Sequence, residues 1–161
     1  AQMTAPHRTT TTRGRAGATL ADTQMSVHIS DSGAQRLILD PIDPKLVQRL
    51  SANSRAQSHW PRTNAKNAVQ DRVFNEAVYQ RLRPFAVPVS VTFRWIVPTR
   101  GRRDLDNLAS NGIVKASLDA LVEGRWLADD SSQWVREVRT EMEYERGRRA
   151  LEITLAPVEE R

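Results

Sequence analysis

The chain has 161 residues, no cysteine, and a formal net charge of +5 with a sequence pI near 10.4. This length predicts one domain, and the lack of cysteine excludes disulfides and cysteine-ligated metal sites, which fits a reducing cytoplasm. No apolar run approaches the roughly 18–20 residues of a membrane span, so we expect no membrane partner. The basic charge favours an anionic partner such as nucleic acid.

The first 33 residues contain few of the large apolar side chains that a folded core requires. Four consecutive threonines mark low complexity, and three arginines make the segment basic. Such a composition cannot bury enough apolar surface to offset the entropy of ordering. We therefore predict a flexible basic tail over 1–33, acting as a nucleic-acid-binding arm or merely as an extension. A folded domain over 34–157 and a frayed C-terminus over 158–161 would follow.

Apolar runs and strict alternation predict strands, listed in chain order as 36–40, 87–97, 133–144 and 151–155. The last two strands are separated by a short turn-like segment, which predicts a hairpin. A period of three and four residues predicts a helix over 64–82 and a second helix after residue 112, with a short helical turn over 45–50. The chain should therefore form an α+β domain, a small mixed sheet with helices packed on one face.

Capping residues predict where the two longer helices begin and end. Thr63 or Asn64 would cap the first helix, and Pro84 would end it. Ser110 or Asn111 would cap the second helix, and Gly124 would end it. In the second helix, Lys115 and Asp119 are four residues apart and should share a face.

Residues 102–108, Arg-Arg-Asp-Leu-Asp-Asn-Leu, follow the long strand over 87–97. In extended backbone, Asp104 and Asp106 point to the same side, where their carboxylates repel each other unless a cation lies between them. Carboxylate oxygens suit Mg²⁺, and adjacent arginines attract phosphate, so the motif indicates metal-assisted chemistry on a nucleic-acid backbone. A solvated loop that caps the next helix is the alternative. A calcium loop is excluded, because Leu108 and Ala109 stand where it requires Asp or Asn and then Gly.

An ordered series of motifs resembles the RusA family of Holliday-junction resolvases, which are phage and prophage endonucleases. The series consists of residues 102–108, Lys115, Leu118-Asp119-Ala120-Leu121, Trp126-Leu127 and Asp129-Asp130. The match is close from 102 to about 132, looser from Arg36 onward, and does not cover the tail. The resemblance implies a RusA-like homodimer that cuts four-way DNA junctions with Mg²⁺, for which Mn²⁺ could substitute.

The resemblance also implies the site residues. The metal-binding and catalytic carboxylates would be Asp104, Asp106 and Asp130, with Asp129 as the alternative to Asp130. Lys115 would be the catalytic lysine. The chain departs from the family pattern by five additional residues, 109–113. Five residues rotate a helix by about 1.4 turns, so Lys115 reaches the site only if this insertion is looped out.

The expected function is therefore a Mg²⁺-dependent, structure-selective endodeoxyribonuclease that resolves Holliday junctions by paired nicks, in phage or bacterial recombination and repair. The side chains expected to hold the DNA backbone are Arg55, Arg100, Arg102, Arg103 and Arg125. Two other functions stay open. The insertion favours a non-cleaving protein that binds junctions or duplexes. The acid pair could also serve a phosphatase-like enzyme, although no glycine-rich phosphate-binding loop is found.

Overall fold

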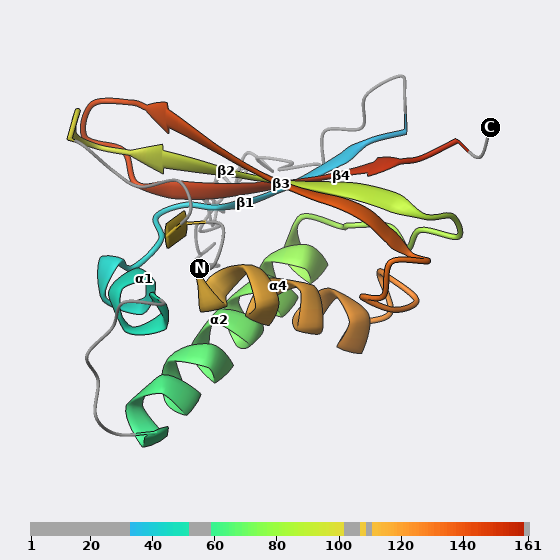
Figure 1. The fold of residues 1–161 in the computed structure, drawn as a ribbon, viewed down its shortest axis with the longest axis horizontal. Helices are drawn as coiled ribbons and strands as arrows, with labels where there is room; N and C mark the ends of the chain where they lie inside the picture. Colours follow the sequence, from blue (N-terminus) through green and yellow to red (C-terminus); the bar gives the residue numbers. More distant parts are fainter. Residues whose placement is uncertain (1–32, 52–58, 102–106, 109–110, 160–161) are drawn as a thin grey trace, which may run out of the picture.

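The computed structural model describes residues 33–51, 59–101, 107–108 and 111–159, with side chains in the second range from Arg62 onward. The elements are, in order, β1 (Gln35–Leu39), α1 (Pro44–Leu50), α2 (His59–Tyr79), β2 (Val89–Val97), α4 (Gly112–Glu123), β3 (Val135–Tyr144) and β4 (Ala150–Pro157). The strands form one mixed sheet in the order β1-β4-β2-β3, and α1, α2 and α4 lie on one of its faces (Figure 1). The predicted α+β class and the mixed sheet are confirmed.

The strand order differs from the prediction at the C-terminal end. β4 is antiparallel to β1 and to β2, whereas β2 and β3 are parallel. The predicted hairpin between the last two strands is wrong, because β2 lies between them. The segment 145–149 crosses the carboxyl end of β2, where the Glu145 N–H donates to the Val97 carbonyl at 3.1 Å. β4 buries residues on both faces and suits a central place, while the charged β3 suits an edge.

The predicted alternation of the long strand is confirmed from Val89 onward. Val91, Phe93 and Trp95 are buried in the same core as apolar side chains of α2 and α4, whereas Val87 lies outside the strand and is 45% exposed. On the neighbouring strand β3, the predicted apolar face pairs with this buried face, for example Val138 with Val91. Yet Val138 is 44% exposed, because β3 is an edge strand of the sheet.

Both ends of α2 differ from the prediction. The helix begins at His59, so Thr63 and Asn64 lie inside it and neither is its cap. Pro61 is tolerated in the first turn, where backbone N–H groups have no partner within the helix. The helix ends before Pro84 is reached, because Arg81 adopts a left-handed φ of 58°. The N–H of Leu82 then donates back to the Ala77 carbonyl at 2.8 Å, which closes the last turn.

The end of α4 repeats this arrangement. Gly124 keeps a right-handed φ of −76°, and Arg125 adopts the left-handed φ of 62° in its place. Gly124 is required for another reason, since a Cβ there would lie 2.0 Å from the Trp126 ring. The Trp126 indole N–H donates to the Leu82 carbonyl at 2.9 Å, which joins the ends of the two helices.

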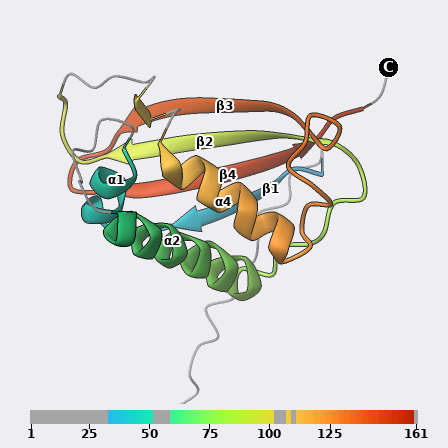
Figure 2. The same cartoon turned by 60° about the horizontal axis from the view of Figure 1, so that its bottom comes forward.

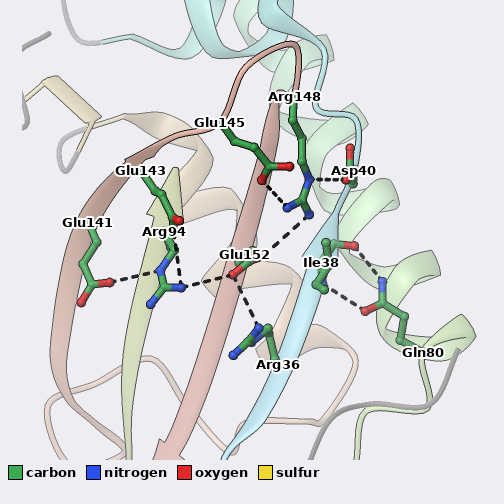
Figure 3. A network of polar contacts seen from close by, with 10 residues as sticks. All are labelled: Arg36, Ile38, Asp40, Gln80, Arg94, Glu141, Glu143, Glu145, Arg148 and Glu152. Carbon is green, nitrogen blue, oxygen red and sulfur yellow. Dashed lines mark hydrogen bonds and ion pairs between the residues drawn. The ribbon is translucent and has the colours of Figure 1, made fainter. Parts of the chain in front are cut away.

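Two buried glutamines complete the hydrogen bonding around β1. The Gln80 side chain accepts the Ile38 N–H at 3.0 Å and donates to the Ile38 carbonyl at 2.7 Å (Figure 3). The Gln35 side chain makes the same pair of bonds with Arg83. It accepts the Arg83 N–H at 2.7 Å and donates to the Arg83 carbonyl at 3.0 Å. Each side-chain amide thus makes the two hydrogen bonds that a neighbouring strand would otherwise make. It satisfies the backbone N–H and carbonyl of Ile38 or Arg83, which would be costly to bury without partners.

The sheet face opposite the helices carries a network of ion pairs centred on Glu152 of β4. The Glu152 side chain is only 8% exposed and lies 3.8–3.9 Å from the guanidinium groups of Arg36, Arg94 and Arg148 (Figure 3). These arginines are therefore occupied by carboxylates of the same chain.

Candidate active site

The start of α4 determines where Lys115 lies. Asn111 caps the helix, because its side chain accepts the Ile113 N–H at 3.0 Å and donates to the Val47 carbonyl of α1 at 3.0 Å. A Cβ at Gly112 would lie 3.2 Å from Leu50, so α1 and α4 approach closely here. The predicted cap at Asn111 is confirmed. The helix thus begins inside the insertion 109–113, and Lys115 lies in its first turn.

The ammonium group of Lys115 lies between two carboxylates. Its Nζ is 2.8 Å from Asp119 Oδ1 and also donates a hydrogen bond to Asp130 Oδ2. The other oxygen of Asp119, Oδ2, lies 3.0 Å from the Nζ of Lys66 on α2. Three segments of the chain therefore meet in one series of ion pairs. We call Lys66, Asp119, Lys115 and Asp130 the lysine–aspartate cluster.

The packing of α2 against α4 brings the cluster together. The two helices lie side by side (Figure 2), with Lys66 of α2 beside Asp119 of α4. Toward their ends, the rings of Phe74 and Trp126 are 5.2 Å apart, so the helices run in the same direction. Lys115 and Asp119 share a face because they are four residues apart, as predicted. The segment between α4 and β3 then returns Asp130 to Lys115.

Hydrogen bonding fixes the charge of both central side chains. Burial raises the pKa of Asp119, but hydrogen bonds from Lys115 and Lys66 outweigh this effect and hold its pKa below the ordinary range. Hydrogen bonds to Asp119 and Asp130 raise the pKa of Lys115 above its ordinary range. Lys115 is therefore a cation at neutral pH. It can stabilise negative charge, but it cannot accept a proton as a general base.

The two neighbouring acids, Asp129 and Asp130, have different partners. The carboxylate of Asp129 accepts the Asp130 N–H at 2.9 Å, and a hydrogen bond from the Ser131 hydroxyl lowers its pKa. Asp129 therefore organises its own turn. The side chain of Asp130 is 33% exposed and points to Lys115. Contact with Lys115 thus distinguishes Asp130 from Asp129.

The predicted DNA-binding arginines divide between two ends of the domain. Arg100 is exposed after the carboxyl end of β2, with its guanidinium 4.8 Å from the centre of the Tyr144 ring. Arg125 is exposed and lies near the amino end of β2. Its neighbour Trp126 accepts a hydrogen bond through its carbonyl from the N–H of Phe85, shortly before β2, at 2.9 Å. The nine residues of β2 span about 30 Å, so Arg100 and Arg125 do not form one surface. The other predicted residues, Arg55, Arg102, Arg103, Asp104 and Asp106, lie outside the described residues.

The chemistry of Asp130 fits the metal that the sequence predicts. Its carboxylate oxygens are hard ligands, and Mg²⁺ commonly takes one or two carboxylates together with water and phosphate. The other two predicted ligands, Asp104 and Asp106, lie outside the described residues. Within the described ranges, no group of three His, Cys, Asp or Glu side chains could hold a metal ion.

Sequence reasoning did not identify Lys66. The period of α2 predicted core positions on this helix and no chemistry. Lys66 acquires its partner only because α2 packs against α4, and no local pattern in either helix indicates this pairing. Asp119 was predicted to share a face with Lys115, and the ion pair at 2.8 Å confirms it.

Two further findings bear on the class of protein. No helix in the described part of the chain is both long and apolar enough to cross a membrane. In comparisons with known proteins, no family model and no curated protein matches the chain.

Proposed function

We propose that the chain is a Mg²⁺-dependent endodeoxyribonuclease that resolves four-way DNA junctions as a homodimer. One observation carries the proposal beyond the resemblance of its motifs to RusA resolvases. Lys115 contacts Asp130, which lies 15 residues further along the chain, although the insertion 109–113 precedes the lysine. These are two of the positions that the motif series implies as catalytic. Their contact supports the nuclease, because Lys115 lies beside one of the three proposed carboxylates despite the insertion.

The residues of the site have distinct roles in this reaction. Asp130, with Asp104 and Asp106, would hold Mg²⁺, which supplies an activated water and stabilises charge on the scissile phosphate. Lys115 stays protonated, so it stabilises the charge that develops on a phosphate or leaving oxygen. Arg100 is exposed and can contact the DNA backbone, which makes affinity depend on salt. Junction selectivity would then follow from DNA shape and from the spacing of two sites in the dimer.

A non-cleaving junction- or duplex-binding protein is the second candidate. It is favoured by the ion pairs of the cluster itself, because the two ammonium groups of Lys115 and Lys66 already balance the two carboxylates of Asp119 and Asp130. In this protein the lysine–aspartate cluster would join α2, α4 and the following segment. DNA would still bind through exposed arginines such as Arg100.

The two candidates are separated by cleavage of a labelled four-way junction, with duplex and single-stranded DNA as competing substrates, each with and without Mg²⁺. The nuclease predicts paired nicks in the junction that require Mg²⁺ or Mn²⁺. Asp130→Asn should lower the rate more than about 10-fold. Asp129→Asn is the matched control, since it removes the same charge one residue away and should cut nearly as well as the parent. Junction binding without nicks in either metal would establish the second candidate.

A further inference from the structure

We infer that Asp119 is a positioning residue, which together with Lys66 holds Lys115 where the nuclease reaction needs it. This role depends on the nuclease function proposed above. Within the described residues, Asp119 forms ion pairs with Lys115 and Lys66. It acts through Lys115, and Lys66 acts through Asp119.

The exposure of the side chains shows why Lys115 needs an anchor. The Lys115 side chain is 63% exposed, so the core does not fix its four-carbon stem. A free lysine samples many rotamers, and confining it to one costs side-chain entropy. Asp119 is a better-fixed anchor, since its side chain is only 22% exposed and both of its oxygens are engaged.

Lys66 fixes the orientation of that anchor. Its ammonium group takes Oδ2 of Asp119 at 3.0 Å, which leaves Oδ1 facing Lys115 at 2.8 Å. Because Lys66 belongs to α2 and Asp119 to α4, the pair also couples the position of Lys115 to the packing of the two helices. Removing Lys66 would let the Asp119 carboxylate rotate about its side-chain bonds.

The second partner of Lys115 cannot replace this anchor during the reaction. Asp130 is a proposed metal ligand, so its oxygens would be shared between a bound metal ion and the lysine. Asp119 has no such second duty. It should therefore provide most of the hold on Lys115 in the reacting complex.

Single-turnover cleavage of a four-way junction, with its dissociation constant measured separately in EDTA, tests this role. Asp119→Asn should lower the cleavage rate by about 10-fold, because misplacement of a catalytic group is costly, while junction affinity stays within about two-fold. Asp119→Glu keeps the charge at a spacing that favours a helical ion pair and should restore most of the rate. Glu123→Gln, one turn further along α4, is the matched control and should cut like the parent.

Lys66 provides the second arm of the test. Lys66→Met should lower the rate by about three-fold in the parent and should have no further effect when Asp119 is already Asn, because residues in one ion-pair series are not additive. The urea unfolding midpoints of the parent, the two single variants and the double variant, measured in EDTA, should also be non-additive. Independent effects of the two changes, or Asp119→Asn cutting at the parental rate, would overturn the inference while leaving the nuclease intact. A parent that binds but never nicks the junction would instead refute the proposed nuclease and this role of Asp119 with it.

Discussion

The Gln80 side chain offers the sharpest test of how this fold is held together. Gln80 is 5% exposed and makes three hydrogen bonds, to the N–H and carbonyl of Ile38 and to Glu76 at 2.9 Å. Gln80→Met keeps a similar length but removes every one of these bonds. Each net hydrogen bond contributes about 1 kcal/mol, and leaving a polar group without a partner costs about 1–3 kcal/mol. We therefore expect a loss of about 2–4 kcal/mol.

A loss of this size is large against a typical total stability of about 5–15 kcal/mol. Urea unfolding should show a lower midpoint with an unchanged slope, because the surface exposed on unfolding stays nearly the same. Each kcal/mol should also lower the melting temperature by about 2–4 °C in a chain of this size. Gln70→Met, on α2, is the matched control. If Gln80→Met costs less than about 0.5 kcal/mol, or no more than the control, the amide does not secure β1 and the reasoning fails.

Three other predictions concern single positions. Arg81→Gly should raise the free energy of unfolding by about 0.5–1 kcal/mol, because glycine adopts the left-handed φ of 58° without strain; a lower urea midpoint would contradict this. Ser117→Ala should raise the melting temperature, since the fully buried hydroxyl has no hydrogen-bond partner among the described residues; an unchanged or lower value would point to a partner elsewhere in the chain. The folded pKa of Asp119 is depressed, so its ion pairs stabilise the fold fully above about pH 4 and are lost as the pH falls through that folded pKa. Urea midpoints of the parent and Asp119→Asn should therefore converge between pH 7 and pH 3, and a constant difference would argue against the ion pairs.

Local patterns in the sequence determined the types of the main elements and the buried faces of β2 and α4. The alternation from Val87 predicted one face of β2, which the structure confirms from Val89, and the periodicity from Val114 predicted the core side of α4. The cap at Asn111 and the shared face of Lys115 and Asp119 were also predictable. All of these depend on residues within a few positions of one another, where the backbone geometry of a strand or helix fixes the directions of the side chains.

Tertiary structure alone decided the order of the strands. A five-residue connection between β3 and β4 permits a hairpin, and it also permits the observed crossing over the end of β2. The choice depends on which strands can be buried on both faces, and β4 has two such faces whereas β3 carries charges on one. The local sequence also did not predict the left-handed residues that follow α2 and α4, Arg81 and Arg125. Arginines are left-handed there, where local preference favours glycine, and the hydrogen bond from the Trp126 indole to the Leu82 carbonyl joins the two ends.

The candidate site divides in the same way. The types of side chain, paired acids beside arginines and a lysine near a second acid, were present in the sequence and suggested phosphate chemistry. Only the packing of α2 on α4 placed Lys66 on Asp119, and only the return of the chain after α4 placed Asp130 on Lys115. Contacts between residues far apart in sequence depend on how whole elements pack, because no local backbone geometry relates their side chains.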